Sequence, residues 1–477
     1  GDHRDLHSFL HDALPIFMKK QDLKDLLEQS EGKKILFLGK EGIYTTQEID
    51  RYLKKYKLKR VKAIEEDVVA SVEHHSLNPV EEMISEDSYE RRIPAYKLET
   101  FEKLLSEGIN DDELLMAIKL SNDQARVLRM IENPDISDAL FIKLLGMYAW
   151  HTDEEDNNED RSVVIATLTR YIDVTPAERD QLYSTLTLKR LVREATDPEL
   201  LNALIGFPNY GFKQKERGQT SLYEVIATSR YLNEEVIKRL LSLRDPKVDM
   251  YLAANPVVSL EELKKFAGRE DQAIHEALAS NERIDDALFE LLLDRGEGVV
   301  KLLLWYQPIT EDRFMMIAEK LTDPYLVAEL GRNLQIDTEI LMALLESDNI
   351  LLLEHIAANR SVPSHLLKAL HEKLIKSTFY PLAGNPNLPV YIVKELYGSY
   401  KNDHEMMHQV ASNPNTPEEI IRELYNRDEL GINKGLAANP ATPVEILDVL
   451  KIDTRLRNAL TKNETFIKHH NRTKVVI

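Results

Sequence analysis

The stretch LAANPATPVEIL, residues 436–447, decides the fold, because variants of it recur along most of the chain. Its Asn439 marks the turn at the centre of the recurring element. The aligned positions are Ser229, Asn255, Asn281, Gln307, Asn333, Asn359, Asn385, Asn413, Asn439 and Asn463. Successive positions differ in number by 26, 26, 26, 26, 26, 26, 28, 26 and 24. A period this constant predicts an array of helical repeats, in which each repeat packs on its neighbours.

The residues around each marked position predict two helices joined by a turn. An aliphatic residue such as Leu436 stands three positions before the Asn, and a small residue such as Ala437 stands two before it. We therefore expect a short, buried first helix that neighbouring repeats approach closely. The Asn side chain can bond backbone groups of the turn, and a following proline such as Pro440 ends the first helix. An apolar residue seven positions after the Asn, such as Ile446, begins the buried stripe of the second helix.

The start of the second helix carries its own signals. Polar residues four positions after the Asn, such as Ser259 and Asp285, are expected N-caps. The segments Thr416-Pro417-Glu418-Glu419 and Thr442-Pro443-Val444-Glu445 predict capping boxes, in which the threonine and glutamate side chains each bond a backbone N–H group of the first turn.

Composition excludes several classes of chemistry. The 477 residues carry 61 Lys+Arg against 81 Asp+Glu, a formal net charge of −20, and no cysteine. Without cysteine there are no disulfides, thiolate zinc sites or cysteine nucleophiles. The acidic balance argues against general binding of nucleic acid, although a local basic stripe could exist. No window approaches 18 uninterrupted apolar residues, so we expect no membrane partner and a cytoplasmic protein.

The N-terminal part has a different pattern. The stretch HDALPIF at 11–17 resembles translated adapter sequence, so we expect residues 1–17 to be a non-native or disordered extension, with Met18 as the natural start. Short apolar runs at 33–39, 60–64, 68–74 and 93–98 alternate with helical patterns, which predicts the order β-α-β-β-α-β-α. The sequence LGKEG after the first run lacks both common nucleotide-binding glycine patterns.

That order, with the closing segment RRIPAYKLETFEKLL (91–105), resembles a BRCT domain over about residues 33–108. Phosphopeptide-binding members of that family place Ser or Thr before the glycine that ends the first strand. Leu38 stands there, before Gly39. The resemblance therefore implies a BRCT-like α/β domain over 18–108 and argues against a phosphate pocket in it.

The remaining chain divides into irregular and regular repeats. Residues 109–228 are predicted to form irregular helical repeats with two inserted loops, at 153–160 and 207–219. Residues 229–477 are predicted to form regular 26-residue repeats with a C-terminal cap. The element A-x-N-P-x-T-P-x-E-I-L is similar to the leucine-rich repeat variant family, strongly over 225–465 and more loosely over 108–225. This resemblance implies a mainly α fold, a right-handed α-solenoid related to HEAT-like repeats. Some members carry an iron–sulfur module, which this cysteine-free chain cannot bind, so no cofactor is expected.

One segment raises the possibility of catalysis. His404-Glu405-Met406-Met407-His408 matches HExxH, in which two histidines on one helical face hold zinc and the glutamate activates water. A third ligand could come from Glu419 or Glu423. The alternative is a solvated helix surface, because the segment falls in the short first helix of a repeat. Metal site and plain surface both stay open at this point, and the sequence assigns no catalytic residue.

Two clusters are candidate interaction sites. Trp305-Tyr306 replaces the usual pair of small residues in the middle of the array, and Met315-Met316 follow it. These four residues predict either an exposed interface patch or a locally repacked core. Lys213, Lys215 and Arg217, with Tyr210 and Phe212 nearby, form a small basic and aromatic cluster that could contact nucleic acid or an acidic partner.

Repeat arrays offer extended surfaces and few convergent catalytic groups. The sequence therefore predicts a non-enzymatic protein-interaction scaffold with a protein partner of unknown identity. An accessory protein of DNA repair or maintenance is the first alternative, since BRCT-like and helical-repeat proteins can contact DNA. A zinc hydrolase that uses the HEMMH segment is the second.

Overall fold

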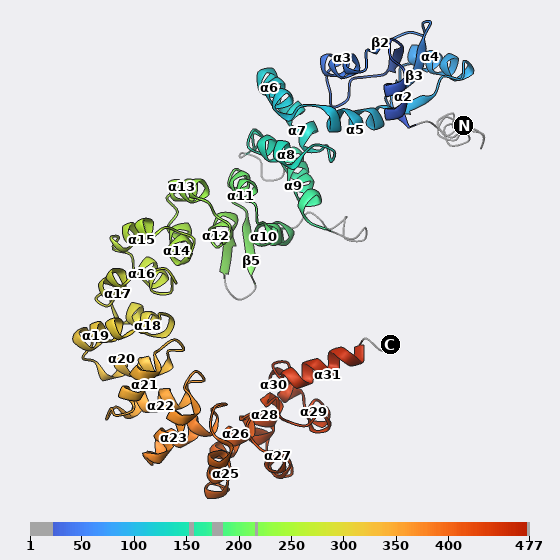
Figure 1. Ribbon diagram of the computed structural model, residues 1–477. Helices are drawn as coiled ribbons and strands as arrows, with labels where there is room; N and C mark the ends of the chain where they lie inside the picture. The colour runs from blue at the N-terminus through green and yellow to red at the C-terminus, as the bar shows by residue number, and fades with distance from the viewer. Residues whose placement is uncertain (1–21, 152–156, 174–184, 215–217, 475–477) are drawn as a thin grey trace. The chain divides into compact units, whose positions relative to one another are not determined.

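A computed structural model describes residues 22–151, 157–173, 185–214 and 218–474 (Figure 1). The mainly helical class predicted from the sequence is confirmed, together with a small parallel sheet. The chain forms two compact units, Gly1–Leu240 and Leu241–Ile477. The predicted extension at 1–17 lies outside the described residues. Within these residues, no helix is both long and apolar enough to cross a bilayer.

The first unit begins with an α/β part. Its elements are α2 (Leu23–Gln29), β1 (Lys34–Leu38), α3 (Thr46–Lys55), β2 (Lys59–Val61), β3 (Val68–Glu73), α4 (Pro79–Glu90), β4 (Ala95–Lys97) and α5 (Leu98–Gly108). The strands and helices from β1 to α5 follow the predicted order. All neighbouring strands are parallel, in the order β2-β1-β3-β4, so β2 and β4 are the edges.

Buried side chains on the sheet and on α5 hold this part together. Ile35, Leu36 and Ala70 on the central strands are fully buried, as expected for a parallel sheet covered by helices. Gly39 ends β1 with φ +96°, and a Cβ there would come within 2.5 Å of the Cβ of His74. The chain can therefore turn away from β1 only because residue 39 is glycine.

A buried polar cluster ties α5 to the segment before α3. The Glu102 carboxylate accepts hydrogen bonds from the backbone N–H groups of Ile43 (2.6 Å) and Tyr44 (3.4 Å). The Tyr44 hydroxyl lies 2.7 Å from the Ser106 hydroxyl. Burial is the main cause that raises the pKa of Tyr44 to about 12 and the pKa of Glu102 above its usual range.

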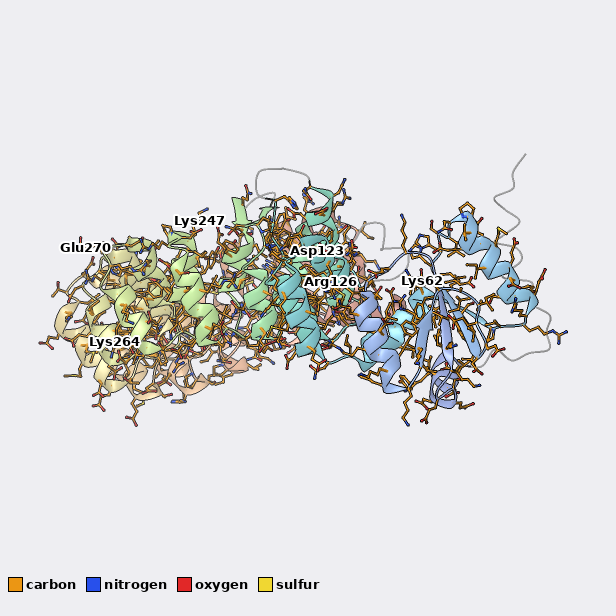
Figure 2. The ribbon with its side chains drawn as sticks, turned by 90° about the horizontal axis from the view of Figure 1, so that it is seen from above. Lys62, Asp123, Arg126, Lys247, Lys264 and Glu270 are labelled. Carbon is orange, nitrogen blue, oxygen red and sulfur yellow. The ribbon has the colours of Figure 1, made fainter. Side chains whose placement is uncertain are left out.

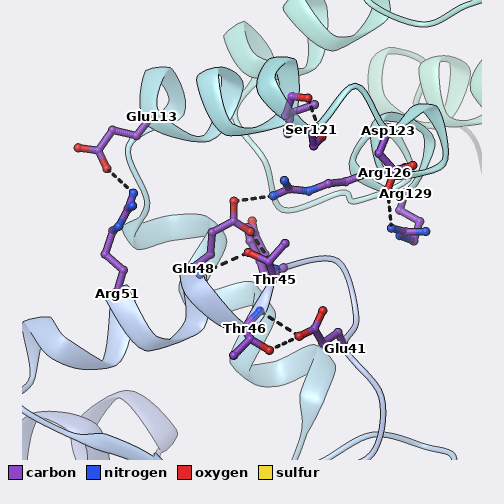
Figure 3. Close-up of polar contacts among 12 residues, drawn as sticks. Glu41, Thr45, Thr46, Glu48, Arg51, Glu113, Ser121, Asp123, Arg126 and Arg129 are labelled. Atoms are coloured by element: carbon purple, nitrogen blue, oxygen red, sulfur yellow. Dashed lines mark hydrogen bonds and ion pairs between the residues drawn. The ribbon is translucent and has the colours of Figure 1, made fainter.

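A buried ion pair joins the α/β part to the helices that follow. Arg126 on α7 (Gln124–Ile131) contacts Glu48 on α3 (Figure 3), and their side chains are only 6% and 8% exposed. Glu48 also accepts the backbone N–H of Thr45 at 2.9 Å, as the fourth residue of a capping box. One carboxylate thus caps α3 and anchors α7.

The rest of the first unit is mostly helical. Its elements are α6 (Asp111–Ser121), α7, α8 (Asp138–Leu145), α9 (Asn158–Tyr171), α10 (Thr185–Glu194), α11 (Pro198–Leu204), β5 (Gly211–Gln214), β6 (Gly218–Ser221), α12 (Leu222–Ala227) and α13 (Glu234–Ser242), which crosses the unit boundary. Where an inserted loop was predicted at 207–219, β5 and β6 pair as antiparallel strands.

The prediction of a loop over all of 153–160 was wrong at its end. Residues 158–160 belong to α9, because the Asn157 side chain accepts the N–H groups of Glu159 (2.8 Å) and Asp160 (3.2 Å) and caps the helix. Asp160 is buried and accepts the Tyr148 hydroxyl at 2.8 Å. Part of the acidic run therefore has a structural role.

The second unit consists of helices in two alternating sets. The first helices of the repeats are α14 (Pro246–Ala254), α16 (Gln272–Ala279), α18 (Glu297–Tyr306), α20 (Pro324–Ala328) with η2 (Glu329–Arg332), α22 (Ile350–Ala358), η3 (Lys376–Thr378) with α24 (Phe379–Ala383), α26 (His404–Ser412), α28 (Leu430–Ala438), and η4 (Thr454–Leu456) with α30 (Arg457–Leu460). The second helices are α15 (Leu260–Ala267), α17 (Asp286–Leu292), α19 (Glu311–Lys320), α21 (Thr338–Leu344), α23 (Ser364–Glu372), α25 (Val390–Ser399), α27 (Glu418–Tyr425), α29 (Val444–Leu450) and α31 (Glu464–Lys474).

Successive first helices pack on one another (Figure 1). The small residues two positions before each marked residue, which we call the small column, make this possible. Ala253, Ala279 and Ala437 are fully buried, and at Gly331 even a Cβ would come 2.8 Å from the backbone oxygen of Leu352 in the next repeat. The aliphatic column that precedes it is buried throughout, as at Leu436.

The marked asparagines form a ladder of hydrogen bonds from repeat to repeat. From Asn281 onward, each marked asparagine donates through Nδ2 to two backbone carbonyls of the preceding repeat, one of which belongs to the preceding marked residue. For Asn439 these are Ala411 O at 2.9 Å and Asn413 O at 2.8 Å, while its Oδ1 accepts the N–H of Ala441 at 2.8 Å. The Nδ2 donors of this ladder are Asn281, Asn333, Asn359, Asn385, Asn413, Asn439 and Asn463.

The predicted capping boxes at Thr416 and Thr442 were wrong. The Thr416 hydroxyl donates back to Val410 O at 2.5 Å, and the Thr442 hydroxyl donates to Leu436 O at 2.7 Å. The N-cap positions are Pro417 and Pro443, which make no side-chain cap. A threonine hydroxyl can bond either helix, and here it donates to the carbonyls at the end of the first helix, which also accept the backbone N–H groups of Asn413 and Asn439.

Candidate functional site

The repeat around Gln307 is where the regular pattern breaks. Gln307 keeps the ladder, because its Nε2 reaches Ala279 O and Asn281 O, both at 2.9 Å. The turn that follows Gln307 has a backbone pairing with the next repeat. Ile309 pairs with Ile336 in an isolated parallel bridge, and its N–H donates to Gln335 O at 3.2 Å.

A buried arginine fills the space behind this altered turn. Arg313 donates through Nε to Asp286 at 2.7 Å and through Nη2 to Ile284 O at 3.0 Å. Its guanidinium lies 4.8 Å from the ring centre of Phe289. Arg313 is therefore packed in the core behind the turn, while Trp305 is half-buried and Tyr306 is exposed.

On the first-helix side, a line of polar contacts crosses three repeats. The half-buried Trp305 donates its indole N–H to Glu329 Oε2 at 2.7 Å. Glu329 pairs with Arg332 at 3.0 Å, and the Arg332 guanidinium lies 2.8 Å from His355 Nε2. His355 Nδ1 lies 2.8 Å from Ala328 O. A carbonyl can only accept, so Nδ1 carries the proton and Nε2 accepts from Arg332.

Two large apolar side chains stand exposed beside this line. Tyr306 is 54% exposed and Leu334 is 64% exposed. Gln335, the residue after Leu334, is linked to Tyr306 across adjacent repeats, since its side chain donates to Tyr306 O at 3.4 Å. We name this group the central surface. It consists of Trp305, Tyr306, Glu329, Arg332, Leu334 and His355.

The predicted patch of Trp305, Tyr306, Met315 and Met316 is divided by the structure. Met315 is 64% exposed and Met316 half-buried, but both lie on α19, a second helix, whereas Trp305 and Tyr306 end α18, a first helix. The sequence missed Glu329, Arg332 and His355. Gly331, which replaces alanine in the small column, was the one signal of an unusually close contact there.

The HEMMH segment forms the start of α26. Met406 and Met407 are fully buried and serve the core. His404 Nδ1 lies 2.6 Å from Glu429, and His408 Nδ1 lies 2.7 Å from Gly431 O, both in the next repeat. These contacts leave the Nε2 atoms of the two histidines as the available ligands.

The proposed third ligands are engaged elsewhere. Glu419 pairs with Lys394 at 3.0 Å, and Glu423 accepts the Tyr397 hydroxyl at 2.5 Å. Glu405 accepts from Gln409 at 2.7 Å. Across the described ranges, no three or more His, Cys, Asp or Glu side chains are grouped so that they could hold a metal ion.

The basic and aromatic cluster of the hairpin is only partly described. Lys213 lies in β5, and Lys215 and Arg217 lie outside the described residues. Phe212 is fully buried, with the Lys189 ammonium 5.7 Å from its ring centre. The ring is thus part of the core and does not offer the stacking platform expected for a nucleic-acid site.

A groove on the α/β part was not predicted. It has a volume of about 610 Å³ and is lined by Asp50, Lys54, Lys57, Leu58, Lys59 and Arg60. A smaller cavity of about 100 Å³ adjoins it through Arg60 and adds Lys40 and Lys62. Figure 2 labels Lys62 on this part of the chain. The signal in the sequence was the basic run RYLKKYKLKRVK at 51–62.

Comparisons with known protein families, with curated proteins and with solved structures found no match to this chain. The function is therefore argued from the contacts described above.

Proposed function

We propose that this chain is a non-enzymatic protein-interaction scaffold. In this proposal the repeats form an α-solenoid of the leucine-rich repeat variant type, preceded by a BRCT-like domain, and the protein acts in the cytoplasm. The regular ladder supports a solenoid, because it gives every repeat from Asn281 to Asn463 the same backbone contact with the repeat before it. A solenoid presents long continuous surfaces that suit macromolecular partners.

The central surface is the single observation that carries the interaction role. The exposed tyrosine, the arginine and the half-buried tryptophan of this surface are the residue types that dominate binding energy at protein interfaces. The fold does not require Trp305 and Tyr306, since most other repeats place small residues at both positions; the large exceptions, at the position of Tyr306, are Arg332 and Lys462. The line from Trp305 to His355 holds the surface in one conformation before a partner binds, which lowers the entropic cost of binding.

The test compares two exposed tyrosines on the same unit. Tyr306 and Tyr391 are 54% and 56% exposed, and Tyr391 lies on α25, a second helix outside the central surface. Tagged Tyr306→Ala and Tyr391→Ala chains are recovered from the native organism, and bound proteins are quantified by mass spectrometry. The proposal expects a specific partner that binds the unmodified chain and Tyr391→Ala but is lost from Tyr306→Ala. Identical sets of proteins on all three chains would contradict it.

A further inference from the structure

We propose that the basic edge of the α/β part binds the phosphate backbone of a nucleic-acid duplex. We name this surface the lysine edge. It consists of Lys40, Lys54, Lys57, Lys59, Arg60 and Lys62, which line the groove and the adjoining cavity. This proposal is independent of the central surface, which lies in the other unit.

The charge of this surface is opposite to that of the chain. Residues 51–62 contain seven basic and no acidic residues, in a protein with a net charge of −20. The core needs only the buried Tyr52, Leu53 and Leu58 of this run. The basic side chains project from the end of α3, from a turn in which Lys57 has φ 56°, and from the edge strand β2 with the residue after it. Folding therefore does not account for their density.

Two nearby acidic groups, Asp50 and Glu31, are paired with basic side chains of this surface, whereas Glu81 and Glu41 bond backbone N–H groups and keep their negative charge. Asp50 pairs with Arg60 at 2.8 Å, and Lys57 pairs with Glu31. In the smaller cavity, Glu81 accepts the N–H of Gly39 at 3.1 Å, and Glu41 accepts the N–H of Thr46 at 3.3 Å.

Four lysines of this surface are left over once these pairs are made. Among the described residues, no acidic side chain forms an ion pair with Lys40, Lys54, Lys59 or Lys62. All four are exposed. At physiological salt, interactions beyond about 8 Å are screened, so these local charges outweigh the acidic balance of the distant surface. The lysine edge is thus a cationic surface suited to an anionic partner.

The surroundings favour a duplex over a single strand. Single-strand sites place exposed aromatic rings along a basic groove, on which the bases stack. The rings near the lysine edge are instead engaged with each other. Phe37 packs on Phe101 with ring centres 5.0 Å apart, and Tyr52 packs on Tyr56 at 5.4 Å. Lysine ammonium groups are point charges that contact phosphates without reading bases. We therefore expect binding that depends on salt and not on sequence.

The experiment measures binding of the full chain to a labelled DNA duplex of about two helical turns. Fluorescence anisotropy is recorded at salt concentrations from about 50 to 200 mM. With four lysine–phosphate contacts, log affinity should fall with log salt with a slope of about −3 to −4. The variant Lys54→Gln/Lys59→Gln/Lys62→Gln should bind at least about tenfold more weakly at low salt. Its slope of log affinity against log salt should be less negative by about 3.

The matched control removes the same charge elsewhere in the first unit. Lys24, Lys97 and Lys119 are exposed and lie outside the lysine edge, so Lys24→Gln/Lys97→Gln/Lys119→Gln should bind as the unmodified chain does. Circular dichroism and melting curves of both variants check that the fold is kept. An RNA duplex as a second probe tells which duplex is preferred, and binding of either supports the proposal.

Three results would overturn it. The first is equal loss of binding in both triple variants. The second is tighter binding of single-stranded DNA than of the duplex. The third is complete displacement of the duplex by polyglutamate or by vesicles with anionic headgroups at equal charge concentration, which would assign the lysine edge to an acidic protein or a membrane surface.

Discussion

The side-chain amide of Asn439 lies 2.8 Å from the backbone carbonyl of Asn413, the residue that holds the same position one repeat earlier. Asn413 in turn donates to Asn385 O at 2.9 Å, and Asn385 donates to Asn359 O at 3.0 Å. These amides are buried, so each bond replaces one that water would have made. The same residue closes the turn of its own repeat and fixes the distance to the repeat before it.

Removal of one amide from this ladder should destabilise the second unit. Asn439→Ala removes the buried side-chain donor to the Ala411 carbonyl and one of the two donors to the Asn413 carbonyl, which also accepts the Thr416 N–H, and we expect a cost of about 1–3 kcal/mol. Urea unfolding followed by circular dichroism measures the effect. Asn402→Ala is the control, because Asn402 is exposed and should change stability by less than about 0.5 kcal/mol. Equal midpoints for the two variants would show that the ladder does not support the fold.

The pair of Arg126 and Glu48 should contribute far more to stability than its exposed neighbour. Arg126→Met leaves the buried Glu48 carboxylate without its partner, and we expect a loss of about 3 kcal/mol. Arg51→Met breaks a 3.5 Å pair with Glu113, in which both side chains are over 60% exposed (Figure 3). We expect less than about 1 kcal/mol there. Trp150 fluorescence in a Trp305→Phe background reports unfolding of the first unit alone, and similar losses in both variants would contradict this ranking.

The first unit should lose stability at high pH through Tyr44. Its pKa is raised to about 12, chiefly by burial. The folded chain therefore keeps a proton that the unfolded chain releases near pH 10. The stability from this group is complete below pH 10 and is lost as the pH rises toward 12. In Tyr44→Phe the decline in unfolding midpoint between about pH 10 and 12 should be shallower. An unchanged slope would mean that Tyr44 titrates normally.

The HEMMH segment should not hold stoichiometric zinc. A protein zinc site needs at least three ligands, and Glu419 and Glu423 are bonded to Lys394 and Tyr397. Elemental analysis of protein purified without chelators, and then dialysed, measures the content. His408→Ala is compared with His365→Ala, an exposed histidine on α23. One zinc per chain that is lost only in His408→Ala would instead support the hydrolase alternative.

The sequence predicted those features that depend on interactions between residues close together in the chain. The Asn-Pro turns, the aliphatic column at Leu436 and the small column at Ala437 follow from backbone geometry within one repeat, so they could be read directly. The succession of strands and helices along the chain in the α/β part could be predicted from its short apolar runs for the same reason.

Contacts between repeats could not be predicted in this way. The Asn side chain was expected to bond its own turn, and the sequence does not show that its amide also reaches the equivalent turn of the preceding repeat. Thr416 carried a correct capping pattern, but a carbonyl of the preceding helix competed for its hydroxyl. The central surface depends on contacts among Glu329, Arg332 and His355, which lie in two different repeats. The lysine edge depends on which of its basic side chains form ion pairs with acidic side chains in the folded chain.

Small-angle X-ray scattering of the full chain tests most directly the proposed solenoid, in which the repeats from Asn255 to Asn463 stack in one direction. A compact protein of this length would have a radius of gyration of about 23 Å. The eight steps from Asn255 to Asn463, at about 9 Å each, already span about 70 Å of helix stacking. We predict a radius of gyration well above the compact value and a distance distribution with a long tail. A radius of gyration close to the compact value, with a symmetric distribution, would contradict the account.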